Sequence, residues 1–185
     1  MLNIFSLLAR IKQTSQRRLS RYGVFIAALV LTFGLHVDTA LAANLSISPS
    51  SVTTKIGKTF TVDLVVNNNI DAINAVAALV TYSADTLSIV SVSKAGSFIS
   101  LWAEEPIFSN EKGTLKLEGV ALNPGFNKAT GKVVSVTFKA IQEGNVSVAV
   151  KSGQVLANDG NATDVLKTTG AAFVYITDDK TPALA

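Results

Sequence analysis

Residues 60–66 have the sequence FTVDLVV, in which large apolar side chains occupy every second position: Phe60, Val62, Leu64 and Val66. Successive side chains of a β-strand point to opposite faces of its sheet, so this period of two predicts a strand with one buried face. The same period recurs along the chain in residues 45–47, 76–82, 87–92, 115–117, 134–138, 146–150, 155–156 and 173–175. In the last of these runs we expect Phe173 and Tyr175 on the buried face.

Short clusters of turn-forming residues separate the runs, among them Asn123-Pro124-Gly125 and Glu143-Gly144-Asn145. Gly adopts backbone conformations that other residues avoid, Pro has a fixed φ that suits a turn, and the Asn side chain can hydrogen-bond to the nearby backbone. Such clusters therefore mark the ends of strands. Eight or nine short strands joined by frequent turns indicate a β-sandwich, and no stretch predicts a substantial helix. We expect one domain at residues 43–177.

Residues 1–42 have the three parts of a secretory signal peptide. A basic stretch precedes the apolar run at residues 23–37, and Ala40-Leu41-Ala42 follows it. The run is shorter than the roughly 20 apolar residues of a membrane-spanning helix, although a retained anchor remains the alternative. We expect cleavage after Ala42, a secreted extracellular protein without membrane contact after cleavage, and a polar C-terminal tail at residues 178–185.

The composition after residue 42 excludes several kinds of chemistry. Every Arg and the only His precede residue 43, Cys is absent, and the formal net charge of +3 comes from the N-terminal basic stretch. Without imidazole or thiolate, neither an ordinary zinc site, nor a Ser-His or Cys-His nucleophile, nor a disulfide can form. A nearly neutral chain without Arg is also a poor nucleic-acid binder. We therefore expect no enzymatic activity and no nucleic-acid partner.

Two adjacent acids, Glu104 and Glu105, are the closest approach to a glycosidase pair. Such a pair has to flank one bond, whereas neighbours on an extended chain point to opposite faces. We expect both in a solvated loop.

The lone tryptophan, Trp102, follows Phe98 and Ile99 in a segment that we expect between strands. It could stack on a carbohydrate, or it could close one end of the sandwich as an apolar plug. The plug is the simpler interpretation, because a sugar platform usually has more than one aromatic ring.

A candidate calcium loop lies at Asp159, Asn161 and Asp164, where oxygen donors alternate with other residues. It lacks the bidentate Glu that completes an EF-hand loop. A polar turn is the simpler interpretation.

Six short motifs follow one another in a familiar order: KIGKTFTV at 55–62, INAV at 73–76, YSADTL at 82–87, GTLKLEG at 113–119, GKVVSVTFKA at 131–140 and VLANDG at 155–160. In this order the chain resembles a cohesin domain, the dockerin-binding module of cellulosome scaffoldins, which is related to the β-sandwiches of carbohydrate-binding modules. The resemblance covers nearly the whole chain after residue 42. It departs from the better-known cohesins at Ala75 and Ala77, where they often carry Asn and Asp.

The resemblance implies a nine-stranded, jelly-roll-like antiparallel β-sandwich without catalytic activity. It implies docking of a dockerin-like protein in polysaccharide-degrading or cell-surface assemblies. It also implies that the chain needs no cofactor of its own, because the calcium of such complexes belongs to the loops of the dockerin.

The phase of residues 73–82 predicts where such a partner would bind. If Tyr82 faces the core, alternation puts the side chains of Ala75, Ala77, Leu79 and Thr81 on the opposite, open face. The following strand contributes its own outward residues beside them. We name this predicted surface the partner face: Ala75, Ala77, Leu79, Thr81, Lys116, Glu118 and Val120.

Direct binding of a polysaccharide is the alternative function, with Trp102 as the candidate contact. Related sandwiches bind sugars through exposed aromatic residues. We rank it second, because most aromatic residues of this chain are in phase with the predicted core.

Overall fold

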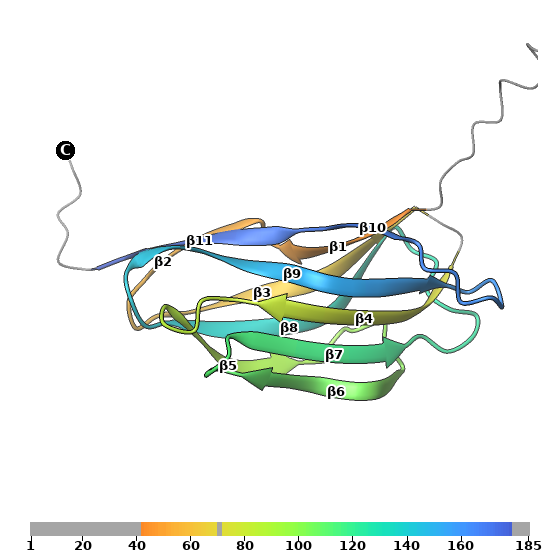
Figure 1. Ribbon diagram of the computed structural model, residues 1–185, viewed down its shortest axis with the longest axis horizontal. Coiled ribbons are helices and arrows are strands. Elements are labelled where there is room, and N and C mark those ends of the chain that lie inside the picture. The colour runs from red at the N-terminus through yellow and green to blue at the C-terminus, as the bar shows by residue number, and fades with distance from the viewer. Residues whose placement is uncertain (1–41, 70–71, 179–185) are drawn as a thin grey trace, which may run out of the picture. The chain divides into compact units, whose positions relative to one another are not determined.

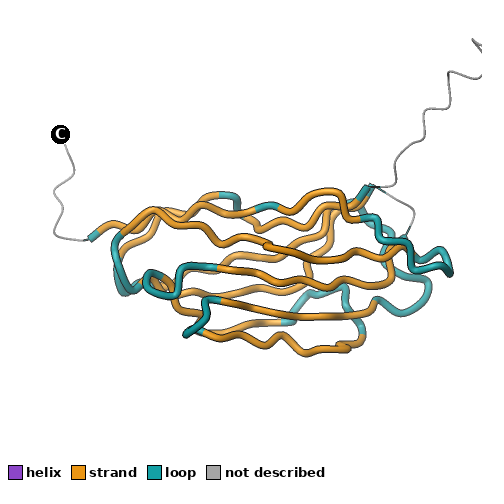
Figure 2. Tube along the Cα trace, viewed as in Figure 1, coloured by secondary structure: helices purple, strands orange, loops and turns teal. Residues whose placement is uncertain are grey.

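The computed structural model describes residues 42–69 and 72–178, and every regular element within them is a β-strand (Figure 2). The predicted absence of a helix is thus confirmed for these residues. None of the described elements is a helix that could cross a membrane. The predicted signal peptide, except Ala42, and residues 179–185 of the predicted tail lie outside the described residues.

The strands form two sheets packed face to face, which confirms the predicted β-sandwich (Figure 1). The five-stranded sheet has the order β10-β1-β3-β8-β5. Its strands are β1 (Ala43–Ser48), β3 (Thr59–Asn68), β5 (Leu87–Ser93), β8 (Thr130–Ala140) and β10 (Leu166–Thr169). The six-stranded sheet has the order β2-β11-β9-β4-β7-β6. Its strands are β2 (Ser51–Lys55), β4 (Ile73–Thr81), β6 (Leu101–Ser109), β7 (Thr114–Val120), β9 (Gly144–Ala157) and β11 (Ala171–Thr177).

The described residues form eleven strands, where the sequence predicted nine. The first and last segments each change sheets midway: β1 passes to β2 around Pro49, and β10 passes to β11 at Gly170. The changes place β1 beside β10 and β2 beside β11, both in parallel, so each sheet has one parallel pair in an otherwise antiparallel ladder. The predicted antiparallel sandwich is confirmed except at these two pairs, which are parallel.

Two further differences concern β6 and β9. Residues 101–109 form strand β6, so the prediction that Trp102, Glu104 and Glu105 lie between strands was wrong. The runs 146–150 and 155–156 belong to one strand, β9, whose register against β4 shifts between Val150 and Ser152. An extra residue in a strand moves all later side chains to the other face, which makes one strand look like two in the sequence.

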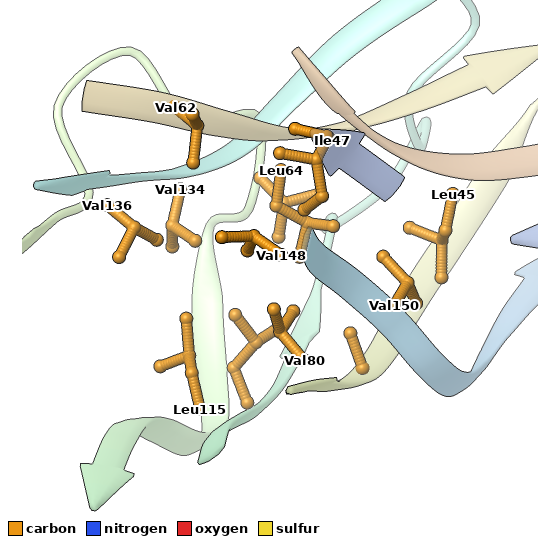
Figure 3. Close-up of a cluster of buried hydrophobic side chains, with 14 of the residues drawn as sticks. Leu45, Ile47, Val62, Leu64, Val80, Leu115, Val134, Val136, Val148 and Val150 are labelled. Atoms are coloured by element: carbon orange, nitrogen blue, oxygen red, sulfur yellow. The ribbon is translucent and has the colours of Figure 1, made fainter. Parts of the chain in front are cut away.

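The core consists of the inward side chains of both sheets (Figure 3). Leu64 and Val62 of β3 point toward Val80, Leu115 and Val148 of the six-stranded sheet, and all five are at most 2% exposed. Full burial of one Val or Leu side chain contributes about 1.5–3 kcal/mol, so the stacked sheets need no disulfide.

Tyr82 points into this core and is 7% exposed, as its phase with Val76 and Val80 predicted. Its ring meets the ring of Phe138 edge to face, with centroids 5.1 Å apart. Burial of the phenol raises the pKa of Tyr82 above its usual value, since the charged form would lose its hydration.

The phase predicted for β11 was wrong. Ala172, Val174 and Ile176 face the core, whereas Phe173 is 58% and Tyr175 is 45% exposed. Both faces of this strand are apolar in sequence, so a period of two gives no preference between them. In the structure the face of β11 with the smaller side chains is the buried one.

Candidate functional site

The partner face lies on the outer surface of the six-stranded sheet. In β4 the side chains of Val76, Ala78 and Val80 are buried, and those at the alternate positions are partly exposed on the other side. In the ladder between β4 and β7, Ala75 lies opposite Val120, Ala77 opposite Glu118, Leu79 opposite Lys116, and Thr81 opposite Thr114. The structure therefore brings the seven predicted residues together on two adjacent strands.

The middle of the partner face is slightly hollow. A shallow depression of about 300 Å³ lies over Ala77 and Leu79 and is bounded by Lys116, Glu118 and Gln154. The small side chain of Ala77 leaves this space, since a longer residue at that position would project into it.

Strands β9 and β6 extend the face beyond the residues that the sequence predicted. Gln154 and Ser152 of β9 lie opposite Ala77 and Leu79. On the far side Leu101 and Ile107 of β6, 56% and 61% exposed, lie opposite Val120 and Lys116. Sequence patterns missed these residues because the register of β9 shifts and β6 lacks regular alternation. The order of strands in the sheet places these residues beside the partner face, and that order cannot be predicted from a local sequence pattern.

An ion pair joins β7 to β6 across the partner face. The Nζ atom of Lys116 lies 2.7 Å from Oε2 of Glu104. This hydrogen bond, with the negative charges of Glu104 and Glu118, raises the pKa of Lys116. Since Glu104 also lies opposite Glu118 in the ladder, this part of the face carries more acid than base.

The two adjacent acids, Glu104 and Glu105, bind different lysines. Glu104 binds Lys116, while Glu105 binds Lys94 with a distance of 2.7 Å between Nζ and Oε2. The two carboxylates therefore belong to separate ion pairs, consistent with neighbours that point to opposite faces. Both are held in strand β6.

Trp102 packs against the core at the Gly119 position of β7, which lies directly opposite it. A Cβ atom at Gly119 would clash with Cγ2 of Ile99 and lie 3.2 Å from Cε3 of Trp102. The ammonium of Lys94 lies over the indole ring, 5.8 Å from its centroid. This packing supports the plug interpretation; sugar contact at Trp102 stays a prediction.

The candidate calcium loop is a hydrogen-bonded turn. The Asp159 carboxylate accepts hydrogen bonds from the hydroxyl of Thr163 and the backbone N–H of Asn161. These bonds, chiefly the one from Thr163, lower the pKa of Asp159. The carboxylate of Asp164 accepts from the backbone N–H groups of Val155 and Leu166. The carboxylates are thus engaged by the chain itself, and a calcium site here stays a prediction.

Within residues 42–69 and 72–178, no three His, Cys, Asp or Glu residues are grouped so that they could hold a metal ion. No protein-family profile matches the sequence, and no curated protein matches it.

Solved structures of cohesin modules share the fold of this chain. A cohesin of Clostridium acetobutylicum has a TM-score of 0.62 and 13% identity, over 77% of this chain and 95% of that one. A non-cellulosomal cohesin of the archaeon Archaeoglobus fulgidus has a TM-score of 0.60 and 14% identity, over 75% and 94%. A type I cohesin–dockerin complex of Clostridium thermocellum has a TM-score of 0.60 and 13% identity, over 74% and 99%. The resemblance predicted from the sequence is confirmed in the fold: the chain has the fold of a cohesin module.

Proposed function

We propose that this chain is a non-catalytic binding module whose partner face docks a dockerin-like protein. The observation that carries the proposal is an open sheet surface with a small apolar depression at Ala77 and Leu79, in a chain with the cohesin fold.

The composition of the partner face suits a protein interface. Leu79 of β4 and Ile107 of β6 lie on either side of Lys116, and Val120 lies beside Leu101, so apolar and charged side chains alternate across the face. Interfaces of non-obligate complexes are about as apolar as the rest of a protein surface and mix apolar with polar contacts in this way. The acidic excess near Glu118 favours a partner surface with Lys or Arg at that side.

The alanines at positions 75 and 77 bear on how the partner is recognised. Neither side chain can donate or accept a hydrogen bond, so this part of the face offers shape and apolar contact only. We expect the partner to place an apolar side chain in the depression between Ala77 and Lys116.

The same proposal includes the setting of the module. Residues 1–42 direct secretion, calcium belongs to the partner, and docking recruits the module into polysaccharide-degrading or cell-surface assemblies. A type I cohesin with the same fold was solved in complex with its dockerin, which supports a partner of that kind. The separate ion pairs of Glu104 and Glu105 support a role without catalysis.

Calorimetry against a panel of calcium-loaded dockerins tests the proposal. Leu79→Asp replaces the apolar side chain in the depression of the partner face with a hydrated carboxylate, and we expect it to weaken binding at least about 30-fold, as loss of a central interface contact does. The matched control is Val90→Asp, at a position 55% exposed on β5 of the other sheet, and it should bind as the unchanged chain does. Lack of binding to every dockerin, or equal binding by both variants, would contradict the proposal.

A further inference from the structure

A second and larger depression, of about 590 Å³, lies on the six-stranded sheet where β4 separates from β9. The ladder between these strands ends at Thr81 opposite Ala149, so residues 145–147 of β9 pair only with β11. The loss of one neighbouring strand leaves a step in the sheet surface. Its volume falls within the range of about 300–1,000 Å³ that is typical of ligand sites.

Two exposed aromatic rings border this depression. Phe173 and Tyr175 are separated by one residue of β11 and are 58% and 45% exposed on the same face of the sheet. Residues two apart along a strand are roughly 6.5 Å apart, which is the scale of one sugar ring. Neither ring has an aromatic or cationic partner among the described residues. Each is therefore free to stack on a ligand.

Tyr82, Val146 and Val174 also line the depression, and its remaining side chains are polar and uncharged. Ser147 lies opposite Phe173 and Asn145 opposite Tyr175 in the ladder, and Thr81 and Ser83 complete the border. The side chains of Asn145 and Ser147 form no hydrogen bond within the described part of the chain, and both residues are exposed. Asn and Ser can each donate and accept, so they are available to hydroxyl groups of a ligand.

This combination selects one ligand chemistry. With no Lys, Arg, Asp or Glu in its lining, the depression offers no counter-charge to a phosphate, a uronate or a charged peptide. Aromatic faces beside neutral donors and acceptors match a molecule that has apolar ring faces and many hydroxyl groups. A neutral sugar chain has both.

We infer that Phe173 and Tyr175, with Asn145 and Ser147, form a binding site for a neutral glycan, with consecutive sugar rings stacked on the two aromatic rings. The site differs from the sugar contact predicted at Trp102, which is packed against the core. It meets the partner face only at Thr81 and does not depend on the docking of a protein there.

Titration of the purified chain with neutral hexasaccharides of β-linked glucose, xylose or mannose, followed by calorimetry, tests this site. We expect saturable binding of at least one of them and none of hexagalacturonate, which is charged. Phe173→Ala and Tyr175→Ala should each weaken binding about tenfold, the effect of losing one stacked ring. Tyr175→Phe retains the ring and should stay within about twofold of the unchanged chain.

The matched control is Ile107→Ala, which removes an equally exposed apolar side chain from β6 at the far side of the sheet. It should leave glycan binding unchanged. Absence of binding to all three hexasaccharides, or binding that both alanine variants retain, would overturn the inference. The inference would also be overturned if light scattering showed the unchanged chain to be a dimer and Phe173→Ala to be a monomer. The two rings would then form a contact between two copies of the chain. Leu79→Asp should bind the glycan normally, which separates failure of this site from failure of the docking proposal.

Discussion

The Oδ1 atom of Asn110, in the turn between β6 and β7, lies 2.6 Å from the hydroxyl of Tyr82 and accepts its hydrogen bond. The same oxygen accepts from the backbone N–H of Ile89 at 2.7 Å, and Nδ2 of Asn110 donates to the carbonyl of Ile89 at 3.0 Å. Ile89 belongs to β5 of the five-stranded sheet. One amide side chain thus joins the end of β4 and both sheets at one end of the sandwich.

We expect Asn110→Ala to lower the free energy of unfolding by about 2–3 kcal/mol. It removes both hydrogen bonds to the backbone of Ile89 and leaves the Tyr82 hydroxyl only its longer bond, 3.3 Å, to the carbonyl of Ser109. Tyr82→Phe removes the hydroxyl, which donates to Asn110 and lies 3.3 Å from the carbonyl of Ser109, and should cost about 1 kcal/mol. Urea unfolding with an unchanged dependence on denaturant measures both. Equal stability of Asn110→Ala and the unchanged chain would show that the contact contributes nothing.

The raised pKa of Tyr82 predicts a loss of stability in alkali. In the unfolded chain Tyr82 ionises near its usual pKa of 10.0, whereas the buried phenol retains its proton to higher pH. The unfolded state therefore binds fewer protons above that pH, and the free energy of unfolding falls as the pH rises. Thermal unfolding at several pH values from about 8 to 11 should show a steeper decline for the unchanged chain than for Tyr82→Phe. Parallel curves would contradict the assignment to Tyr82.

Gly119 allows Ile99 and Trp102 to pack on β7, so Gly119→Ala is expected to destabilise the fold by about 1–3 kcal/mol, the usual cost of overpacking. Because Trp102 is the only tryptophan, its fluorescence should shift to longer wavelength as the ring is displaced toward water. Ile99→Ala removes the clashing methyl group, so the double variant should be more stable than the sum of the single effects predicts. If the effects of the two single variants on stability simply added in the double variant, Ile99 would not be the side chain that clashes with a Cβ atom at position 119.

The phase of β11 is open to a direct test with two neighbouring positions. Val174→Asp introduces a charge at a position with 0% exposure and should cost about 3 kcal/mol or more, or prevent folding. Phe173→Asp changes a residue 58% exposed and should change stability by less than about 1 kcal/mol. Chemical unfolding of both proteins decides between the two phases. The opposite order of stabilities would place Phe173 in the core.

The sequence predicted strands where only one face is apolar. Thr61 and Asp63 interrupt the apolar residues of β3, so its buried face is unambiguous in the sequence. The same is true of β7, where Lys116 and Glu118 alternate with buried Leu115 and Leu117. These strands and the phase of Tyr82 were sufficient to predict the sandwich and the placement of the seven residues of the partner face.

The sequence predictions were wrong or incomplete where the local pattern of apolar residues does not determine which face of a strand is buried or which strands pair. In β11 both phases are apolar, and only packing against β9 and β2 determines which one is buried. In β6 two register shifts and Pro106 remove the alternation, so the strand is recognisable only by its pairing with β7. The depression at Phe173 depends on where β4 leaves β9, which no local pattern records.

The irregularity of β6 also affects how readily this edge could pair with a strand of another molecule. This strand is the outermost member of the six-stranded sheet and could offer its free backbone groups to a strand of another molecule. Pro106 has no N–H group to donate, and the two register shifts interrupt the regular spacing that a second ladder would require. At the opposite border of the sandwich the outermost strands, β2 and β10, have only five and four residues. Cross-β growth is thereby discouraged at these three borders, in a domain whose described regular elements are all strands.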